Sequence, residues 1–172
     1  MTVRQHSPTR RFLISLLAGA VAIGVNTALL AGADAVGFTT ARGGLLRLLR
    51  DIAAQVAPHV GLAEIWKTML GPATSGRAFQ TEFHVVVGLL MAVFYAFELE
   101  PRLISSPWVK GLIYAAIVWL LNAFVVLPLT GEGIAGSLHL GLINMVGFAA
   151  VHTVFFVLLS ILYARWVDGA HR

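Results

Sequence analysis

The sequence contains no cysteine and few charged residues. Only 12% of its 172 residues are charged, whereas a soluble domain has about 25%. The absence of cysteine excludes disulfide bonds, thiol catalysis and cysteine-ligated metal sites. The shortage of charge indicates that water is not the only solvent around this chain.

Hydrophobic residues make up 58% of the chain and gather in long runs. A hydrocarbon core needs about 20 apolar residues for each spanning helix. The runs do not alternate between polar and apolar residues, as the strands of a membrane barrel would. The sequence therefore predicts an all-α integral membrane protein with a single polytopic domain over residues 1–172. Its four transmembrane helices are expected over residues 12–36, 83–99, 108–129 and 137–166.

The distribution of basic residues predicts how the chain is oriented. Lys and Arg collect in short cytoplasmic loops. They occur before the first span, between the second and third, and after the fourth: Arg4, Arg10, Arg11, Arg102, Lys110, Arg165 and Arg172. The loop over residues 130–136 has none. The first connection, residues 37–81, carries five, but long loops follow the rule weakly. We expect a bacterial inner-membrane protein with both termini in the cytoplasm.

Topology also accounts for the net charge of +4. In a soluble protein such an excess would suggest nucleic acid, but here no nucleic-acid partner is expected. The expected partners are membrane lipids and, as a further possibility, a second copy of the chain or another membrane subunit.

The first apolar run has two interpretations. Paired arginines in "TRRFLISLL" and the "ADA" at residues 33–35 resemble a signal peptide with its cleavage site. The run is too long for a usual signal core, which favours a retained span. Small residues recur at every fourth position, which lets another helix approach closely: Ala20, Gly24, Ala28 and Gly32. We expect them to pack inside the helix bundle, and a dimer interface is the alternative.

An amphipathic helical segment is expected over residues 44–70, between the first two spans. In "LLRLLRDIAAQVA" the apolar residues follow helical spacing, and Pro58 then interrupts the pattern. The spacing resumes from Leu62 to Met69 and ends at Gly71-Pro72. An interfacial anchor is the simplest interpretation. The alternative is a cap over the outer mouth of the bundle.

Polar residues inside or beside the spans are the main functional candidates, since such groups are costly at membrane depth. With this topology most fall toward the outer side, and His152 falls near mid-membrane. The candidates are Asn26, His84, Asn122, Glu132, His139, Asn144 and His152. The first interpretation is a set of interhelical hydrogen bonds. The alternative is an outward-facing polar cavity for a proton, an ion or a small ligand, with His84 and His139 able to titrate near neutral pH.

Catalysis and cofactor binding have little support in the sequence. Glu98 and Glu100 are followed by Pro101 and Arg102, as at the polar end of a span. No metalloprotease or serine-hydrolase motif is present. We therefore expect no catalytic residues, no metal and no cofactor. Haem held by His84 and His139 is a weaker alternative. Trp108, Tyr163 and Trp166 are expected in an aromatic belt at the cytoplasmic interface.

The stretch "TGEGIAG" matches the G-x-G-x-x-G pattern of dinucleotide-binding loops through Gly131, Gly133 and Gly136. In that fold the glycines follow a β-strand. Here a long apolar span precedes them, so the stretch predicts a tight turn between two helices and no bound nucleotide.

From residue 82 onward the sequence resembles the latter half of the YagU-like family of small bacterial inner-membrane proteins. The resemblance rests on "FHVVVGLLMAVFYAFELEPRL", "KGLIYAAIVWLLNAFVVLPLTG" and "GFAAVHTVFFVLL". The matching positions are His84, Tyr95, Pro101, Gly111, Pro128, Gly131 and His152. The resemblance implies a membrane location and helical hairpins, and it draws attention to His84 and His152. The family's function is unsettled, so it implies no activity.

Together these features predict a non-enzymatic inner-membrane protein with a structural or accessory role. The alternative is a small transport or proton-handling protein with an outward-facing polar cavity. A haem- or quinone-binding redox subunit is a third hypothesis.

Overall fold

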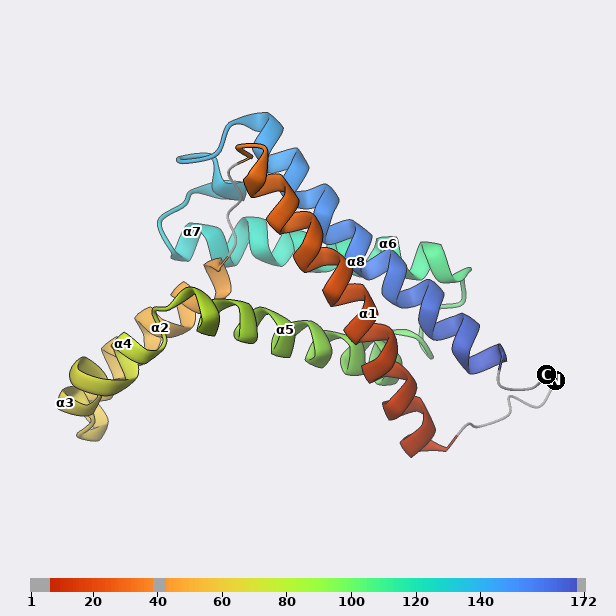
Figure 1. Cartoon of the computed structure of the whole chain (residues 1–172), viewed down its shortest axis with the longest axis horizontal. Helices are drawn as coiled ribbons and strands as arrows, with labels where there is room; N and C mark the ends of the chain where they lie inside the picture. Colours follow the sequence, from red (N-terminus) through yellow and green to blue (C-terminus); the bar gives the residue numbers. More distant parts are fainter. Residues whose placement is uncertain (1–6, 39–42, 170–172) are drawn as a thin grey trace.

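The computed structural model describes residues 7–38 and 43–169, and within them all regular structure is helical. Four helices are long and apolar enough to cross a membrane (Figure 1). The first is α1 (Pro8–Ala35), and the second is α5 (Arg77–Phe94) continued by η3 (Tyr95–Leu99). The third is α6 (Pro107–Leu121) continued by η4 (Asn122–Val126) and α7 (Leu127–Leu129), and the fourth is α8 (Leu142–Gly169). The predicted fold class, an all-α multi-pass membrane protein, is confirmed.

The first residue of a helix is set by its backbone hydrogen bonds, so a helix does not always begin at the first residue of the apolar run. α1 starts at Pro8 because the Ser7 hydroxyl accepts the Arg10 N–H as an N-cap. The expected start of the fourth span at residue 137 is wrong, because α8 starts at Leu142. Residues 137–141 form a turn and a short irregular segment. They follow the short 3₁₀ turn η5 (Ile134–Gly136), in which Ala135 has a φ of 55°.

Three helical segments widen into a π turn six residues before a proline. These are η2 (Trp66–Leu70) before Pro72, η3 (Tyr95–Leu99) before Pro101, and η4 (Asn122–Val126) before Pro128. In each, the residue before the proline donates its N–H to the carbonyl five residues earlier. Proline clashes with the carbonyl four residues before it, and a widened turn relieves that clash.

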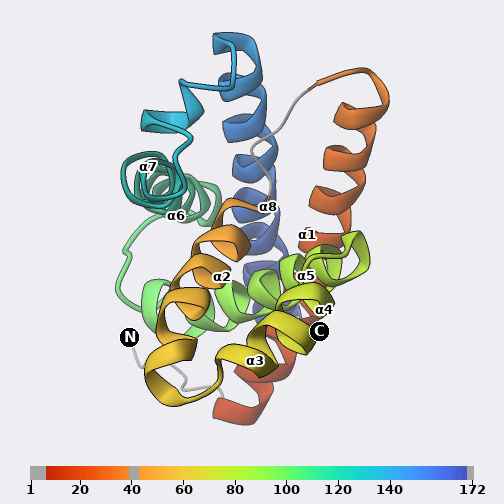
Figure 2. The same ribbon diagram turned by 90° about the vertical axis from the view of Figure 1, so that its left-hand side faces the viewer.

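The spans form a bundle that is open on one side. α1 packs between α5 and α8, and α8 packs between α1 and α6. α5 and α6 meet mainly near the loop that joins them and separate toward their other ends (Figure 2). Near that loop the Tyr114 hydroxyl donates to the Met91 carbonyl over 3.2 Å, and the Tyr95 and Tyr114 rings stack. The divergence of α5 and α6 leaves space within the bundle.

Close helix contact depends on glycines other than the expected ones. A Cβ at Gly111 would lie 2.4 Å from Ser160 Oγ and 2.7 Å from Val157 Cα, so α6 and α8 meet at backbone distance. The expected burial of the small-residue stripe in α1 is wrong, because its members are all exposed: Ala20, Gly24, Ala28 and Gly32. The buried face of α1 contains instead Ser15, Ala18, Gly19, Ala22, Ile23, Asn26 and Leu30.

The start of α1, the end of α8 and the α5–α6 loop lie at one end of the bundle (Figure 1). Arg10 Nη2 donates to the Val167 carbonyl over 3.1 Å. Glu100 forms ion pairs with Arg11 at 3.8 Å and Lys110 at 3.1 Å, which join three spans. Sequence reasoning missed this charged cluster.

The predicted aromatic belt holds only in part. Trp108 and Trp166 lie at this end with exposed side chains. Tyr163 is 2% exposed, and its hydroxyl accepts a hydrogen bond from Arg11 Nε over 3.3 Å. The Tyr163 ring therefore faces the bundle, because a buried phenol needs a polar partner and finds it there. Its place at the membrane interface stays a prediction.

The segment between the first two spans is helical, as predicted, and extends from the opposite end of the bundle (Figure 1). It contains α2 (Gly44–Val56), the 3₁₀ turn η1 (Ala57–Val60) at Pro58, then α3 (Ala63–Ile65), η2 and α4 (Gly71–Ala73). Leu49, Ile52 and Val56 are exposed, as in a helix that lies on a membrane surface. Gly44 and Leu46 at the start of α2 are buried. The start of α2 is thus buried, and its later turns expose apolar side chains. The anchor and cap interpretations both stay predictions.

Candidate functional site

A cavity of about 270 Å³ lies between the four spans, beneath the start of α2. Each span contributes one polar candidate to its wall: Asn26 from α1, His84 from α5, Asn122 from η4 and His152 from α8. Four of the seven sequence candidates are therefore brought together at one place.

Asn26 connects three of the spans. It is 1% exposed, and its Nδ2 donates to the Val151 carbonyl of α8 over 2.9 Å. Its Oδ1 lies 3.0 Å from His84 Nε2 of α5. Because the carbonyl contact fixes the orientation of the amide, His84 Nε2 is the donor to Oδ1. This pair is an interhelical hydrogen bond of the expected kind.

His152 and Asn122 are bound differently. His152 Nδ1 lies 2.9 Å from the Phe148 carbonyl of its own helix, and a carbonyl only accepts, so Nδ1 carries a proton. In the neutral imidazole, Nε2 is then an acceptor, and no described residue donates a hydrogen bond to it. The Asn122 amide likewise forms no hydrogen bond within the described part of the chain. Both residues line the cavity with unused hydrogen-bonding capacity.

The remaining wall is mainly apolar. It includes Phe83, Val87, Met91, Val118, Trp119 and Phe155. Among the described lining residues there is no Asp, Glu, Lys or Arg. Cavities of this type, apolar with a few polar groups, are typical of sites for small molecules.

The start of α2 closes one side of the cavity. Gly43, Gly44, Leu45 and Leu46 line it, together with Gln80 at the start of α5. A Cβ at Gly44 would lie 3.3 Å from Leu127 Cδ2, so glycine lets α2 approach the end of α6–α7 closely. We call Gly43–Leu46 the cap.

An ion pair fastens the residue that follows the cap. Arg47 Nη1 lies 2.5 Å from Glu132 Oε1, and His139 Nδ1 lies 2.8 Å from Glu132 Oε2. Glu132 is only 9% exposed. Burial by itself would raise the pKa of Glu132, but the hydrogen bonds and charges of Arg47 and His139 outweigh it and lower that pKa. Glu132 is therefore ionised at neutral pH, and we call the pair Arg47–Glu132 the latch.

The other sequence candidates lie outside the cavity. His139 was expected at the outer start of span four, but it lies in the loop before α8 with its side chain 65% exposed. The weaker alternative, in which His84 and His139 hold a haem together, gains no support, because the two contact Asn26 and Glu132 respectively. Asn144 is half-buried near the start of α8 and does not line the cavity. Glu132 and His139 act beside the cavity and do not form its wall.

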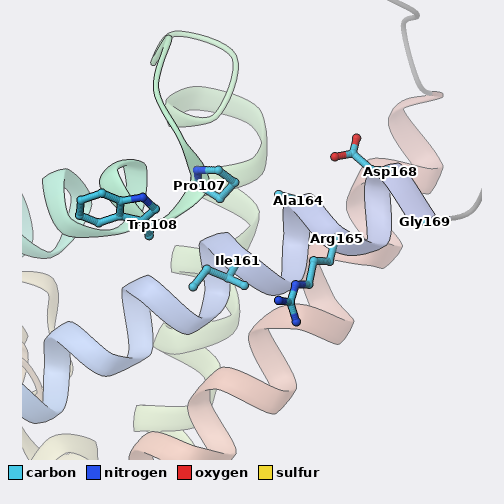
Figure 3. A pocket seen from close by; sticks show the side chains of 7 residues that line it. All are labelled: Pro107, Trp108, Ile161, Ala164, Arg165, Asp168 and Gly169. Atoms are coloured by element: carbon cyan, nitrogen blue, oxygen red, sulfur yellow. The ribbon is translucent and has the colours of Figure 1, made fainter.

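A second hollow of about 480 Å³ lies at the other end of the bundle, between the start of α6 and the last turns of α8 (Figure 3). Its charged side chains, Arg165 and Asp168, are exposed and point in different directions (Figure 3). Although it is larger, its described lining residues come from two helices, and one of them, Trp108, is 55% exposed. We regard it as a surface groove and the cavity between the spans as the candidate site.

Within residues 7–38 and 43–169 there is no cluster of three His, Asp or Glu side chains able to hold a metal ion. The two cavity histidines each have a hydrogen-bond partner.

The chain matches no protein-family model, no curated protein and no solved structure. The resemblance to YagU-like proteins stays a prediction. The candidate site therefore rests on its own geometry.

Sequence reasoning missed several residues that shape the site. Arg47 lies in the segment predicted to be an amphipathic helix, and nothing in its spacing indicated Glu132 as a partner. Gln80 and Trp119 were not singled out, although both line the cavity. A usable signal existed for Trp119, since it lies three residues before Asn122 and therefore on the same helix face.

Proposed function

We propose that this chain is a non-enzymatic inner-membrane protein that binds a small molecule between its spans, as a binding or transport component. The observation that carries the proposal is the convergence of four of the predicted polar candidates, one from each span, on a single cavity that Gln80 also lines. Its volume of about 270 Å³ lies just below the range of about 300–1,000 Å³ for sites of drug-sized ligands. The ligand is therefore small.

Interhelical bonding alone does not account for this arrangement. Asn26 and His84 bond to each other and explain two of the polar groups. His152 and Asn122 lie on the same wall without using their remaining hydrogen-bonding atoms on described residues. Buried polar groups are usually satisfied, so a ligand or water is the expected partner of these atoms.

The lining supports binding over catalysis. Among its described residues there is no carboxylate, no hydroxyl side chain and no lysine. The two histidines are each held by a different partner and share no acid–base arrangement with an ionised group.

The proposal places both termini in the cytoplasm of a bacterium, in line with the resemblance to YagU-like proteins. Basic residues at the terminal end of the bundle support this orientation: Arg10, Arg11, Arg102, Lys110 and Arg165. The loop that carries Glu132 has no basic residue. The cap and the latch then lie at the outer face of the membrane.

Single cysteines test the proposal, because the chain has none of its own. Val118 lines the cavity, and its neighbour Ile117 is 43% exposed on the outside of α6. A small uncharged thiol reagent should modify Val118→Cys faster than Ile117→Cys in the solubilised protein. An impermeant maleimide should reach Ser137→Cys, but not Ser105→Cys, on intact cells. Equal protection of both α6 cysteines would count against an accessible cavity, and reversed sidedness would count against the orientation.

A further inference from the structure

We infer that the cavity takes an uncharged, mainly apolar molecule that carries a hydroxyl group. This inference rests on the proposed binding function and specifies the chemical class of the ligand. Three features carry it: the lack of charge on the wall, the acceptor atom of His152, and the apolar surface around them.

The first feature excludes an ionised ligand. The described lining residues include no acidic or basic side chain that would pair with a charge. Burying an unpaired charge in a low-dielectric interior costs several kilocalories per mole. Arg47, which directly follows the cap, is already paired with Glu132 at 2.5 Å. Among the described lining residues, a carboxylate or an ammonium ion would find no counter-ion.

The second feature selects a hydrogen-bond donor. His152 Nδ1 is bound to the Phe148 carbonyl, so the neutral ring offers only Nε2, which accepts. A ligand that only accepts, such as a ketone, a quinone or an ether, cannot satisfy this atom. A hydroxyl group donates to it.

Asn122 extends the selection to a group that both donates and accepts. Its amide offers two N–H donors and one carbonyl acceptor, and it lines the same cavity as His152. A hydroxyl group accepts a hydrogen bond from such an amide through its oxygen, and it donates one to an imidazole nitrogen through its O–H. A hydroxyl is the smallest neutral group that meets both requirements.

The rest of the ligand must be apolar and short. The wall around the polar groups contains aromatic and aliphatic side chains, including Phe83, Met91 and Phe155. The apolar surface of a ligand is buried favourably against them. The volume of about 270 Å³ limits the length of the hydrocarbon part. Short-chain alcohols, phenols and small hydroquinones belong to this class.

Three bromine-labelled probes of one chain length test the inference: bromohexanol, its methyl ether and bromohexanoate. Bromine quenches tryptophan fluorescence on contact, and Trp119 lines the cavity. The full chain is used with Trp66, Trp108 and Trp166 each changed to Phe, which leaves Trp119 as the reporter. Val118→Phe in the same background fills the cavity and serves as the control. The quenching that remains in this variant comes from probe dissolved in the micelle.

We expect bromohexanol to quench Trp119 at about tenfold lower concentration than the ether or the carboxylate, since one hydrogen bond is worth about a factor of ten. His152→Leu should remove the advantage of the alcohol over the ether. Equal quenching by all three probes, or an unchanged preference in His152→Leu, would overturn the ligand class while leaving a binding cavity. Quenching no greater than in Val118→Phe for every probe would refute the binding function itself. The comparison of probes on the parent protein holds even if His152→Leu does not fold.

Discussion

Breaking the latch should loosen the cap without unfolding the bundle. Glu132 accepts from Arg47 at 2.5 Å and from His139 at 2.8 Å, and its carboxylate is almost fully buried. Glu132→Gln keeps the shape of the side chain and removes its charge. A hydrogen bond to a charged group contributes about 1.5–3 kcal/mol. The Arg47 side chain is 45% exposed, so solvent screening favours the lower end of that range.

A loss of about 1.4 kcal/mol corresponds to a tenfold change in an equilibrium. We therefore expect the cap to open about ten times more often in Glu132→Gln. Val126 is a suitable reporter, because it lines the cavity and a Cβ at Gly44 of the cap would lie 3.6 Å from its Cγ1. The assay is the rate at which a small uncharged thiol reagent modifies Val126→Cys in the full chain.

The Glu132→Gln change should raise this rate about tenfold, and the charge swap Arg47→Glu with Glu132→Arg should restore it. Ser106→Cys, which is exposed at the other end of the bundle, should react at one rate in every background. His139→Gln should have a smaller effect, because the His139 side chain is 65% exposed. Rates at Val126→Cys that are unchanged in both Glu132→Gln and Arg47→Gln would refute the latch.

The remaining predictions concern pH and packing, and thermal unfolding in detergent measures all three. Because its pKa is lowered in the folded protein, ionised Glu132 stabilises the fold at any pH above the usual pKa of a glutamic acid, and this stabilisation is lost as the pH falls through the lower folded pKa. The difference in Tm between the parent and Glu132→Gln should therefore shrink on acidification. A constant difference would contradict this. Gly111→Ala should destabilise the fold by about 1–3 kcal/mol, because its Cβ would lie 2.7 Å from Val157 Cα. A Cβ at Gly24 would have nothing within 4 Å, so Gly24→Ala should be neutral or stabilising. Similar losses of stability in the two variants would show that α6 and α8 do not pack so closely. Asn26→Leu should cost about 0.6–2 kcal/mol for each interhelical hydrogen bond lost, and an unchanged Tm would rule out its contacts with Val151 and His84.

Hydropathy predicted the four spans because a long apolar run has few other stable structures. It did not predict their ends. α8 begins at Leu142, five residues later than expected, because the loop residues before it are apolar enough to resemble a span. Likewise, α1 begins before its apolar run because Ser7 and Pro8 are good residues for a helix start.

The face that each span turns inward was harder to predict. Small residues at every fourth position in α1 indicated one face, yet Gly24 and Gly32 are exposed. Gly19 and Asn26 define the buried face, through close contact with Ala92 and hydrogen bonds to α5 and α8. Spacing in one helix shows which residues share a face, but the neighbouring helices decide which face is buried.

The meeting of the polar residues could be anticipated only as a shared depth. The predicted membrane depth of each polar residue grouped Asn26, His84 and Asn122, which do line one cavity. The same grouping included Asn144 and His139, which lie outside the cavity. The latch could not be predicted from the sequence, because two spans lie between Arg47 and Glu132 along the chain.

The central claim is that the space between the spans holds a small molecule. Native mass spectrometry of the full chain, gently purified from its own membrane, tests it most directly. The account predicts a retained small neutral molecule on the parent protein and on Ile117→Phe, whose added ring faces outward, and none on Val118→Phe, whose ring fills the cavity. A parent protein that carries no small molecule, or equal retention by Val118→Phe, would contradict the account.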